Sequence, residues 1–187
     1  MSEDINNKQK FNFLEFYKKN KNKVFTIIFA LILSIIIFIV LNEFKKKQNI
    51  EISKKYNSAK ILIENNDNQK ALKILENIIS KNNSFYSPSS LNLIIDNNLI
   101  ENKIKILTYF DEIISNTKLD PETKNLFIFK KIIFIGDDIK ENELITNLKP
   151  ILRSNSLLKN QVSDYIKKYY LSKGEFKKAK EFEIPQN

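Results

Sequence analysis

Cysteine, histidine and tryptophan are all absent from the 187 residues of this chain. Without cysteine there is no disulfide, no thiolate catalysis and no cysteine-based metal site. Without histidine the chain lacks the usual general base of enzymes and the commonest metal ligand. We therefore expect no enzyme activity, no catalytic residue, no metal, no cofactor and no small-molecule substrate.

Glycine and proline are also scarce, with two and four occurrences, against about 7% and about 5% in average proteins. These residues build tight turns, barrel corners and phosphate-binding loops. Their scarcity favours an all-α fold whose helices are joined by polar, asparagine-rich connections.

Arginine occurs only once, at Arg153, although the net charge is +9. Surfaces that read bases or grip phosphates prefer the planar fork of arginine, so we expect no nucleic-acid partner. The lysines are interspersed with acids along the chain. Solvated helix faces are the favoured interpretation of this pattern, and attraction to an anionic membrane surface is the alternative.

A long apolar run, Val24–Leu41, contains no charge, no proline and no glycine, and only Thr26 and Ser34 are polar. At about 1.5 Å per residue a helix of this length covers the ~30 Å core of a bilayer. A secretory signal has a shorter apolar region and a small-residue cleavage site, whereas three lysines follow closely here. A buried core helix is the other alternative, but no other segment is apolar enough to cover it. We predict a tail over 1–23, one transmembrane anchor over 24–44, and a helical domain over 45–187.

Aromatic residues precede the run and suit a membrane interface, either as a short amphipathic helix or as a partly ordered tail. They are Phe11, Phe13, Leu14, Phe16 and Tyr17. Six lysines precede the run, and six follow it within about 20 residues. The charge bias that sets membrane orientation is therefore nearly balanced.

Apolar periodicity predicts helices along the rest of the chain. The anchor helix is expected to continue to Asn65, and further helices are expected over 69–80, 141–148, 157–172 and 175–183. Ser87-Pro88 and Asp120-Pro121 each predict a capped start with proline at the first helical position. Residues 127–135 have strand-like composition, but they follow the Asp120 start and are predicted to be helical. Pro150 is expected to break the pattern or to start a new turn.

Polar turns recur at Asn66, Asn98, Gly136 and Gly174, with spacings of 32, 38 and 38 residues. Each turn is followed by a short helix, and the same offset of about five residues leads from the four turns to Ala71, Lys103, Glu141 and Ala179. The spacing is near the ~34-residue period of tetratricopeptide (TPR) repeats. Two-helix units of this kind bury their apolar faces by stacking into a solenoid.

Several segments resemble one family. YNSAKILIENNDNQKALKILENII and YIKKYYLSKGEFKKAKEF resemble TPR units, each with a small residue (Ala59, Ala179) and a turn (Asn66-Asp67, Gly174). The order of tail, single span, TPR-like hairpin, DPET helix start, LKPIL segment and KGEFKKA turn is similar to the YfgM-like ancillary subunits of the SecYEG translocon. The expected fold is therefore a TPR-like helical-hairpin solenoid behind a transmembrane helix.

The resemblance implies a bacterial inner-membrane protein with a cytoplasmic N-terminus and a periplasmic C-terminal domain. It also implies protein partners, namely the SecYEG translocon and periplasmic chaperones that work on emerging chains. By analogy with TPR geometry, the partner-binding positions are Tyr56, Lys60 and Ile63 in the first unit and Asp164 and Lys168 in the last.

Other interpretations stay open. A structural or envelope-organising bitopic membrane protein, such as a division or assembly factor, is the alternative function. Adjacent acids at 111–112 and 137–138 do not face each other on a helix, so we interpret them as solvated surface or turn. The tyrosines at 165, 169 and 170 are interpreted as core packing or, alternatively, as a peptide-binding set.

Overall fold

The computed structural model describes residues 13–182, and the side chains from residue 20 onward. Within that range the chain is all-helical, with no strand. The predicted tail residues 1–12 and the end of the predicted helix at Glu183 lie outside the described residues, as do the side chains of the aromatic group before the apolar run. The chain divides into two compact units, Met1–Asn49 and Ile50–Asn187, which are treated separately below.

The first unit is dominated by α1, which is assigned from Phe13 to Glu64 and so continues into the second unit's sequence. Non-helical backbone at Asn20 (φ −118°, ψ 20°) interrupts the helix before the apolar run. The prediction that the helix continues past Leu41 is confirmed. The hydroxyls of Thr26 and Ser34 donate hydrogen bonds to the carbonyls of Asn22 and Ala30, so both polar side chains have partners within the helix.

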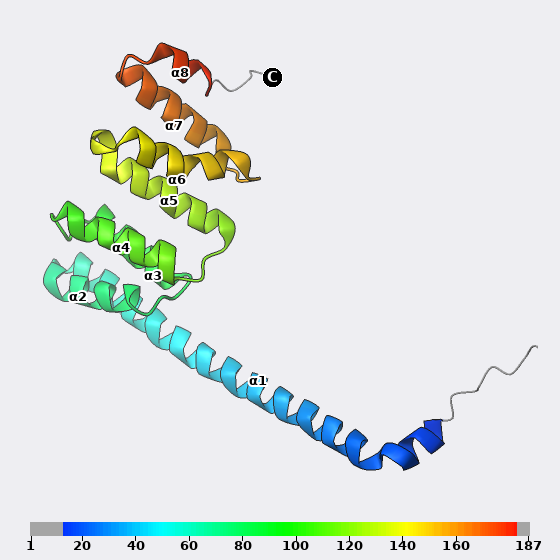
Figure 1. Ribbon diagram of the computed structural model, residues 1–187. Coiled ribbons are helices and arrows are strands. Elements are labelled where there is room, and N and C mark those ends of the chain that lie inside the picture. The colour runs from blue at the N-terminus through cyan, green and yellow to red at the C-terminus, as the bar shows by residue number, and fades with distance from the viewer. Residues whose placement is uncertain (1–12, 183–187) are drawn as a thin grey trace, which may run out of the picture. The chain divides into compact units, whose positions relative to one another are not determined.

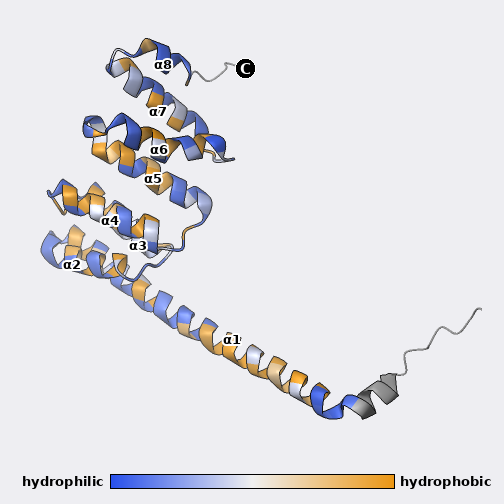
Figure 2. Ribbon diagram, viewed as in Figure 1, coloured by the Kyte–Doolittle hydropathy of each residue, from blue (hydrophilic) through white to orange (hydrophobic). Residues whose placement is uncertain are grey.

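α1 is long and apolar enough to cross a membrane, and it is the one such helix among the described residues. Its large apolar side chains between Phe25 and Leu41 are 48–69% exposed. Figure 2 shows mainly the apolar colour along the middle of α1. The helix therefore presents an apolar surface that no other part of this unit covers.

The second unit comprises the end of α1 and seven further α-helices among the described residues. These are α2 (Asn68–Ile79), α3 (Tyr86–Asp96), α4 (Lys103–Asn116), α5 (Pro121–Ile135), α6 (Glu141–Arg153), α7 (Lys159–Ser172) and α8 (Phe176–Lys180), with a short 3-10 turn, η1 (Gly136–Asp138), between α5 and α6. From α2 onward each helix packs on the next along the chain, and α2 also contacts α4. Figure 1 shows these helices following one another in chain order from α2 to α8.

The four turns expected from the sequence are turns in the structure. Asn66, Asn98, Gly136 and Gly174 have φ of 61°, 48°, 67° and 76°. Glycine and asparagine are the residues that adopt this left-handed backbone most readily, which explains why they occupy these positions. The turns join α1 to α2, α3 to α4, α5 to α6 and α7 to α8, so the chain forms successive helical hairpins.

Two groups of buried side chains hold the hairpins together. The N-terminal core is formed by Ala59, Leu75, Ile79, Leu91, Ile94, Ile106, Phe110, Ile113 and Phe127. The C-terminal core is formed by Phe129, Ile132, Ile139, Leu144, Leu148, Ile151, Val162, Ile166, Tyr170 and Ala179.

α5 contributes to both cores. Phe127 belongs to the N-terminal core, and Phe129 and Ile132 belong to the C-terminal core. The helix is apolar on opposite sides because it separates two packed layers. This position explains the strand-like composition of residues 127–135, and the prediction of a helix there is confirmed. Its start is also confirmed, since Asp120 Oδ1 accepts hydrogen bonds from the backbone N–H of Glu122 and Thr123, with Pro121 at the first position.

The cap expected at Ser87 is wrong. α3 already begins at Tyr86, and Asn83 Oδ1 accepts from the N–H groups of Phe85 and Tyr86. Ser87 is fully buried (0% exposed), where its Oγ accepts from Asn83 N and donates to the carbonyl of Ile78. Asn83 accepts the hydrogen bonds of N–H groups at the start of α3, so Ser87 is not needed as a cap and instead connects α3 to the end of α2.

The break expected at Pro150 is also wrong, because α6 runs to Arg153 with Pro150 inside it. Proline removes one helical hydrogen bond, the one that the Thr146 carbonyl would accept. Both Thr146 and Pro150 are exposed, so water can serve that carbonyl. Leu148 and Ile151, on either side of Pro150, are buried in the C-terminal core and keep the helix continuous.

Candidate functional site

The first predicted group, Tyr56, Lys60 and Ile63, lies on the last part of α1. Tyr56 and Ile63 are partly buried and pack against the N-terminal core, whereas Lys60 is exposed. The Tyr56 ring lies 5.6 Å from the ring of Tyr86 on α3. Burial, followed by the nearby Asp96 and Tyr86, raises the pKa of Tyr56. Two of these three side chains therefore also hold α1 to its neighbours.

The second predicted pair, Asp164 and Lys168, lies on the exposed side of α7. Lys168 Nζ and Asp164 Oδ2 are 2.7 Å apart, one helical turn from each other. Both side chains are more than half exposed, so their ion pair contributes little to stability. The structure thus brings Asp164 and Lys168 together. They lie on a helix of the C-terminal core, whereas the first group lies beside the N-terminal core.

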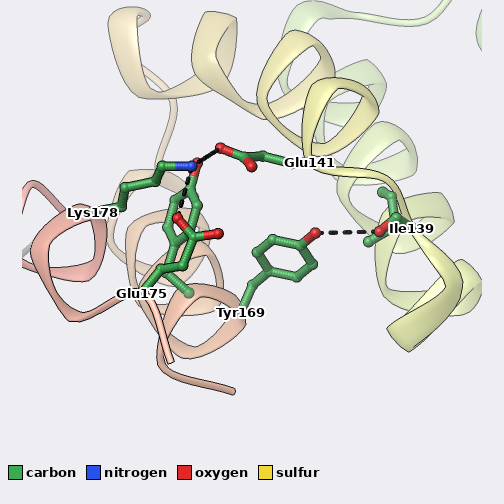
Figure 3. Close-up of polar contacts among 6 residues, drawn as sticks. Ile139, Glu141, Tyr169, Glu175 and Lys178 are labelled. Carbon is green, nitrogen blue, oxygen red and sulfur yellow. Dashed lines mark hydrogen bonds and ion pairs between the residues drawn. The ribbon is translucent and has the colours of Figure 1, made fainter. Parts of the chain in front are cut away.

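The three tyrosines of α7 pack against the C-terminal core. Tyr170 is 3% exposed and belongs to that core. The Tyr165 ring lies edge-on to Phe129, with centroids 5.6 Å apart. Tyr169 donates to the Ile139 carbonyl at 3.4 Å (Figure 3). Of the two interpretations of this set, core packing is the one these contacts favour.

Glu141 at the start of α6 is the centre of a polar cluster that joins three helices (Figure 3). Its Oε1 accepts from Tyr170 at 3.0 Å and from Lys178 Nζ at 2.7 Å. Lys178 also pairs with Glu175 at 2.8 Å. The hydrogen bond from Lys178, followed by that from Tyr170, lowers the pKa of Glu141. Burial, followed by the Glu141 carboxylate, raises the pKa of Tyr170 to about 12.

Glu76 on α2 is the centre of a similar cluster in the N-terminal half. Its Oε1 accepts from Tyr109 at 2.7 Å and pairs with Lys105 Nζ at 2.6 Å, both on α4. The hydrogen bond to Glu76 raises the pKa of Lys105. Each cluster is centred on one carboxylate that contacts a tyrosine and a lysine from other helices. These groups are partnered among themselves, as expected of joints between hairpins rather than of reactive centres.

Two exposed phenylalanines mark surfaces that the sequence did not single out. Phe85 is 66% exposed and lines an open hollow of about 520 Å³ between the start of α3 and the loop before α5. The hollow is also lined by Ser84, Pro88, Ser89, Lys118, Asp120 and Thr123. Phe85 was missed because the Ser87-Pro88 dipeptide was interpreted as the helix start. The sequence did offer one signal, an aromatic residue two positions after Asn83, the asparagine that caps the start of α3.

Phe176 is the second, also 66% exposed, in the first turn of α8. It lines an open hollow of about 670 Å³ with Gly174, Glu175, Lys177 and Lys178. Large exposed aromatics next to polar groups are typical of surfaces that contact other proteins.

The acid pairs noted in the sequence are engaged in surface contacts. Asp138 in η1 pairs with Lys103 at 2.9 Å, and Asp111 pairs with Lys131 at 2.6 Å. Among the residues that the structure describes, no group of three or more potential ligands is arranged to hold a metal ion.

Comparison with known proteins gives no match to a protein-family model, to a curated protein or to a solved structure. The resemblance to YfgM-like translocon subunits therefore rests on the motifs of this sequence alone.

Proposed function

We propose that this chain is a membrane-tethered, TPR-like scaffold that binds other proteins, as an accessory factor of the Sec translocon and the periplasmic chaperones. The observation that carries the proposal is the series of four left-handed turns, at Asn66, Asn98, Gly136 and Gly174, each followed by a helix that packs on its neighbours. Repeated hairpins of this kind expose an extended surface, which such repeats use for binding.

The apolar run of α1 supports the tether. It holds 15 valine, isoleucine, leucine and phenylalanine residues between Val24 and Leu41. At about −0.3 to −0.6 kcal/mol each, their insertion into a bilayer is favourable by about 5–9 kcal/mol. The exposure of these side chains in the first unit supports lipid as their solvent.

The placement of the domain is part of the proposal: the N-terminus in the cytoplasm, the span in the bacterial inner membrane, and the residues after Lys47 in the periplasm. The test is protease treatment of intact and of ruptured spheroplasts. Digestion of the domain in intact spheroplasts supports this placement. Digestion only after rupture places the domain in the cytoplasm and overturns it.

The binding role is tested by site-specific photocrosslinking of the full-length chain in native membranes. A benzoylphenylalanine at Phe85 or at Lys60, both exposed, is expected to capture a translocon component or a periplasmic chaperone. The matched control is the same probe at Thr146, an exposed position on α6 that lines neither of the two hollows described above.

Two outcomes overturn the translocon proposal. One is capture of no translocon or chaperone component from either position, and the other is equal capture from the control. Concentration of the protein at the division site, in place of an even distribution over the membrane, favours the alternative of an envelope-organising protein.

A further inference from the structure

Three consecutive lysines follow the apolar run of α1 almost directly. Lys45, Lys46 and Lys47 lie four to six residues after Leu41, all with exposed side chains. At about 1.5 Å per residue this places them about 6–9 Å beyond the end of the run. That distance is close to one Debye length, which is about 8 Å at physiological salt. Glu43 is the one acid in the sequence between Leu41 and these lysines.

The lysines surround the helix instead of forming one face. Successive residues of a helix are about 100° apart, so the three side chains span about 200° of the circumference. Lys21 and Lys23, at the other end of the run, are likewise exposed and about 200° apart. A protein partner would cover one side of a helix, whereas lipids surround it. The angular spread therefore favours lipid as the occupant.

We propose that Lys45, Lys46 and Lys47 gather anionic phospholipids around α1, through their phosphodiester groups. This inference rests on the transmembrane anchor of the proposed function. Lysine is suited to the role because its apolar stem can lie along the acyl chains while the ammonium reaches the headgroups. Juxtamembrane clusters of basic residues attract anionic lipid by the same electrostatics.

The test uses the full-length chain reconstituted in phosphatidylcholine vesicles with spin-labelled phosphatidylglycerol or spin-labelled phosphatidylcholine. Electron paramagnetic resonance measures the motionally restricted fraction of each lipid. We expect phosphatidylglycerol to associate about two-fold or more over phosphatidylcholine at low salt, and this preference to fall toward one at high salt.

Two triple variants separate the lysine cluster from overall charge. Lys45→Gln/Lys46→Gln/Lys47→Gln is expected to lose more than half of the preference. Lys54→Gln/Lys73→Gln/Lys124→Gln removes the same charge from exposed positions farther along the chain and is expected to keep it. Equal association of the two lipids with the wild type overturns the inference, and so does equal loss in both triple variants.

The experiment also separates this inference from the proposed function. Restriction of neither lipid shows that α1 does not enter the bilayer, which overturns the anchor and the lipid inference together. A preference for phosphatidylglycerol here supports the role of the lysine cluster. If the photocrosslinking experiment then captures no translocon or chaperone component, only the translocon role is overturned.

Discussion

Tyr109 on α4 donates a 2.7 Å hydrogen bond to Glu76 Oε1 on α2, joining two helices that are not consecutive in the chain. Tyr170 on α7 makes the same kind of bond to Glu141 on α6, at 3.0 Å. Neither bond was expected, because 33 and 29 residues separate the partners. Each places a partly or fully buried hydroxyl on a carboxylate, where a charge-assisted hydrogen bond is stronger than a neutral one.

These two tyrosines make stability sensitive to alkaline pH. Burial, followed by the carboxylate, raises the pKa of Tyr109 and of Tyr170 to about 12, from an ordinary 10. A raised pKa stabilises the folded chain fully below pH 10, and this contribution is lost as the pH rises toward 12. We expect the urea midpoint of the wild type to fall between pH 10 and 11 more than that of Tyr109→Phe/Tyr170→Phe. Parallel decline of both proteins would contradict this.

At neutral pH the Tyr170→Phe substitution alone is expected to cost about 1 kcal/mol of unfolding free energy, because the part-buried hydrogen bond to Glu141 is lost. Urea unfolding followed by circular dichroism at pH 7 is the measurement. Tyr165→Phe is the matched control on the same helix, and it should change the unfolding free energy by less than about 0.5 kcal/mol.

Truncation of Phe127 is expected to destabilise the second unit strongly. Its ring is 2% exposed and lies 6.0 Å from that of Phe110, between α5 and the N-terminal core. Phe127→Ala should cost about 3–5 kcal/mol by leaving a cavity. Ile133→Ala, a half-exposed position on the same helix, should cost less than about 1 kcal/mol. Equal effects in urea unfolding would show that α5 is not packed as described.

The Asp120 cap predicts a loss of stability in acid. Hydrogen bonds from the Thr123 side chain and from backbone N–H groups lower the pKa of Asp120 from its ordinary 3.8. A lowered pKa stabilises the folded chain above that ordinary value and stops doing so as the pH falls through the folded value. Thermal unfolding should show Asp120→Ala melting about 2–4 °C lower at pH 7.

Asp120→Asn is the control for this titration, since it keeps an oxygen acceptor but has no carboxylate to protonate. As the pH falls below about 4, the melting temperature of the wild type should fall more than that of Asp120→Asn. A difference that is constant from pH 7 to pH 3 would contradict the role of the charge.

The left-handed backbone conformation at position 174 favours glycine over any residue with a side chain. The φ of Gly174 is 76°, and a methyl group built there meets nothing within 4 Å. Gly174→Ala should therefore cost about 1 kcal/mol through the left-handed conformation alone, without a clash. Ser172→Ala, an exposed position two residues earlier, is the control in the same urea experiment. A cost of Gly174→Ala no larger than that of the control would argue against this turn.

Some local features could be predicted because neighbouring residues decide them. Asp120 and Pro121 start α5 whatever packs on it, since the cap bonds only its own first turn. The turns at Asn66 and Gly174 follow from residues that tolerate positive φ. Ser87 and Pro150 were predicted wrongly because contacts with α2 and with the C-terminal core decide their roles, and neither is visible in the local pattern.

The sequence by itself determined the apolar helix of α1, the all-helical composition and the places where the chain turns. These are set by side-chain solvation and by backbone conformations available to single residues. Only the tertiary structure decided that α5 serves two cores, that Tyr56 and Ile63 pack as well as border the surface, and that Glu76 and Glu141 join separate helices. Such relationships depend on which residues meet across long stretches of chain, and no local pattern carries that information.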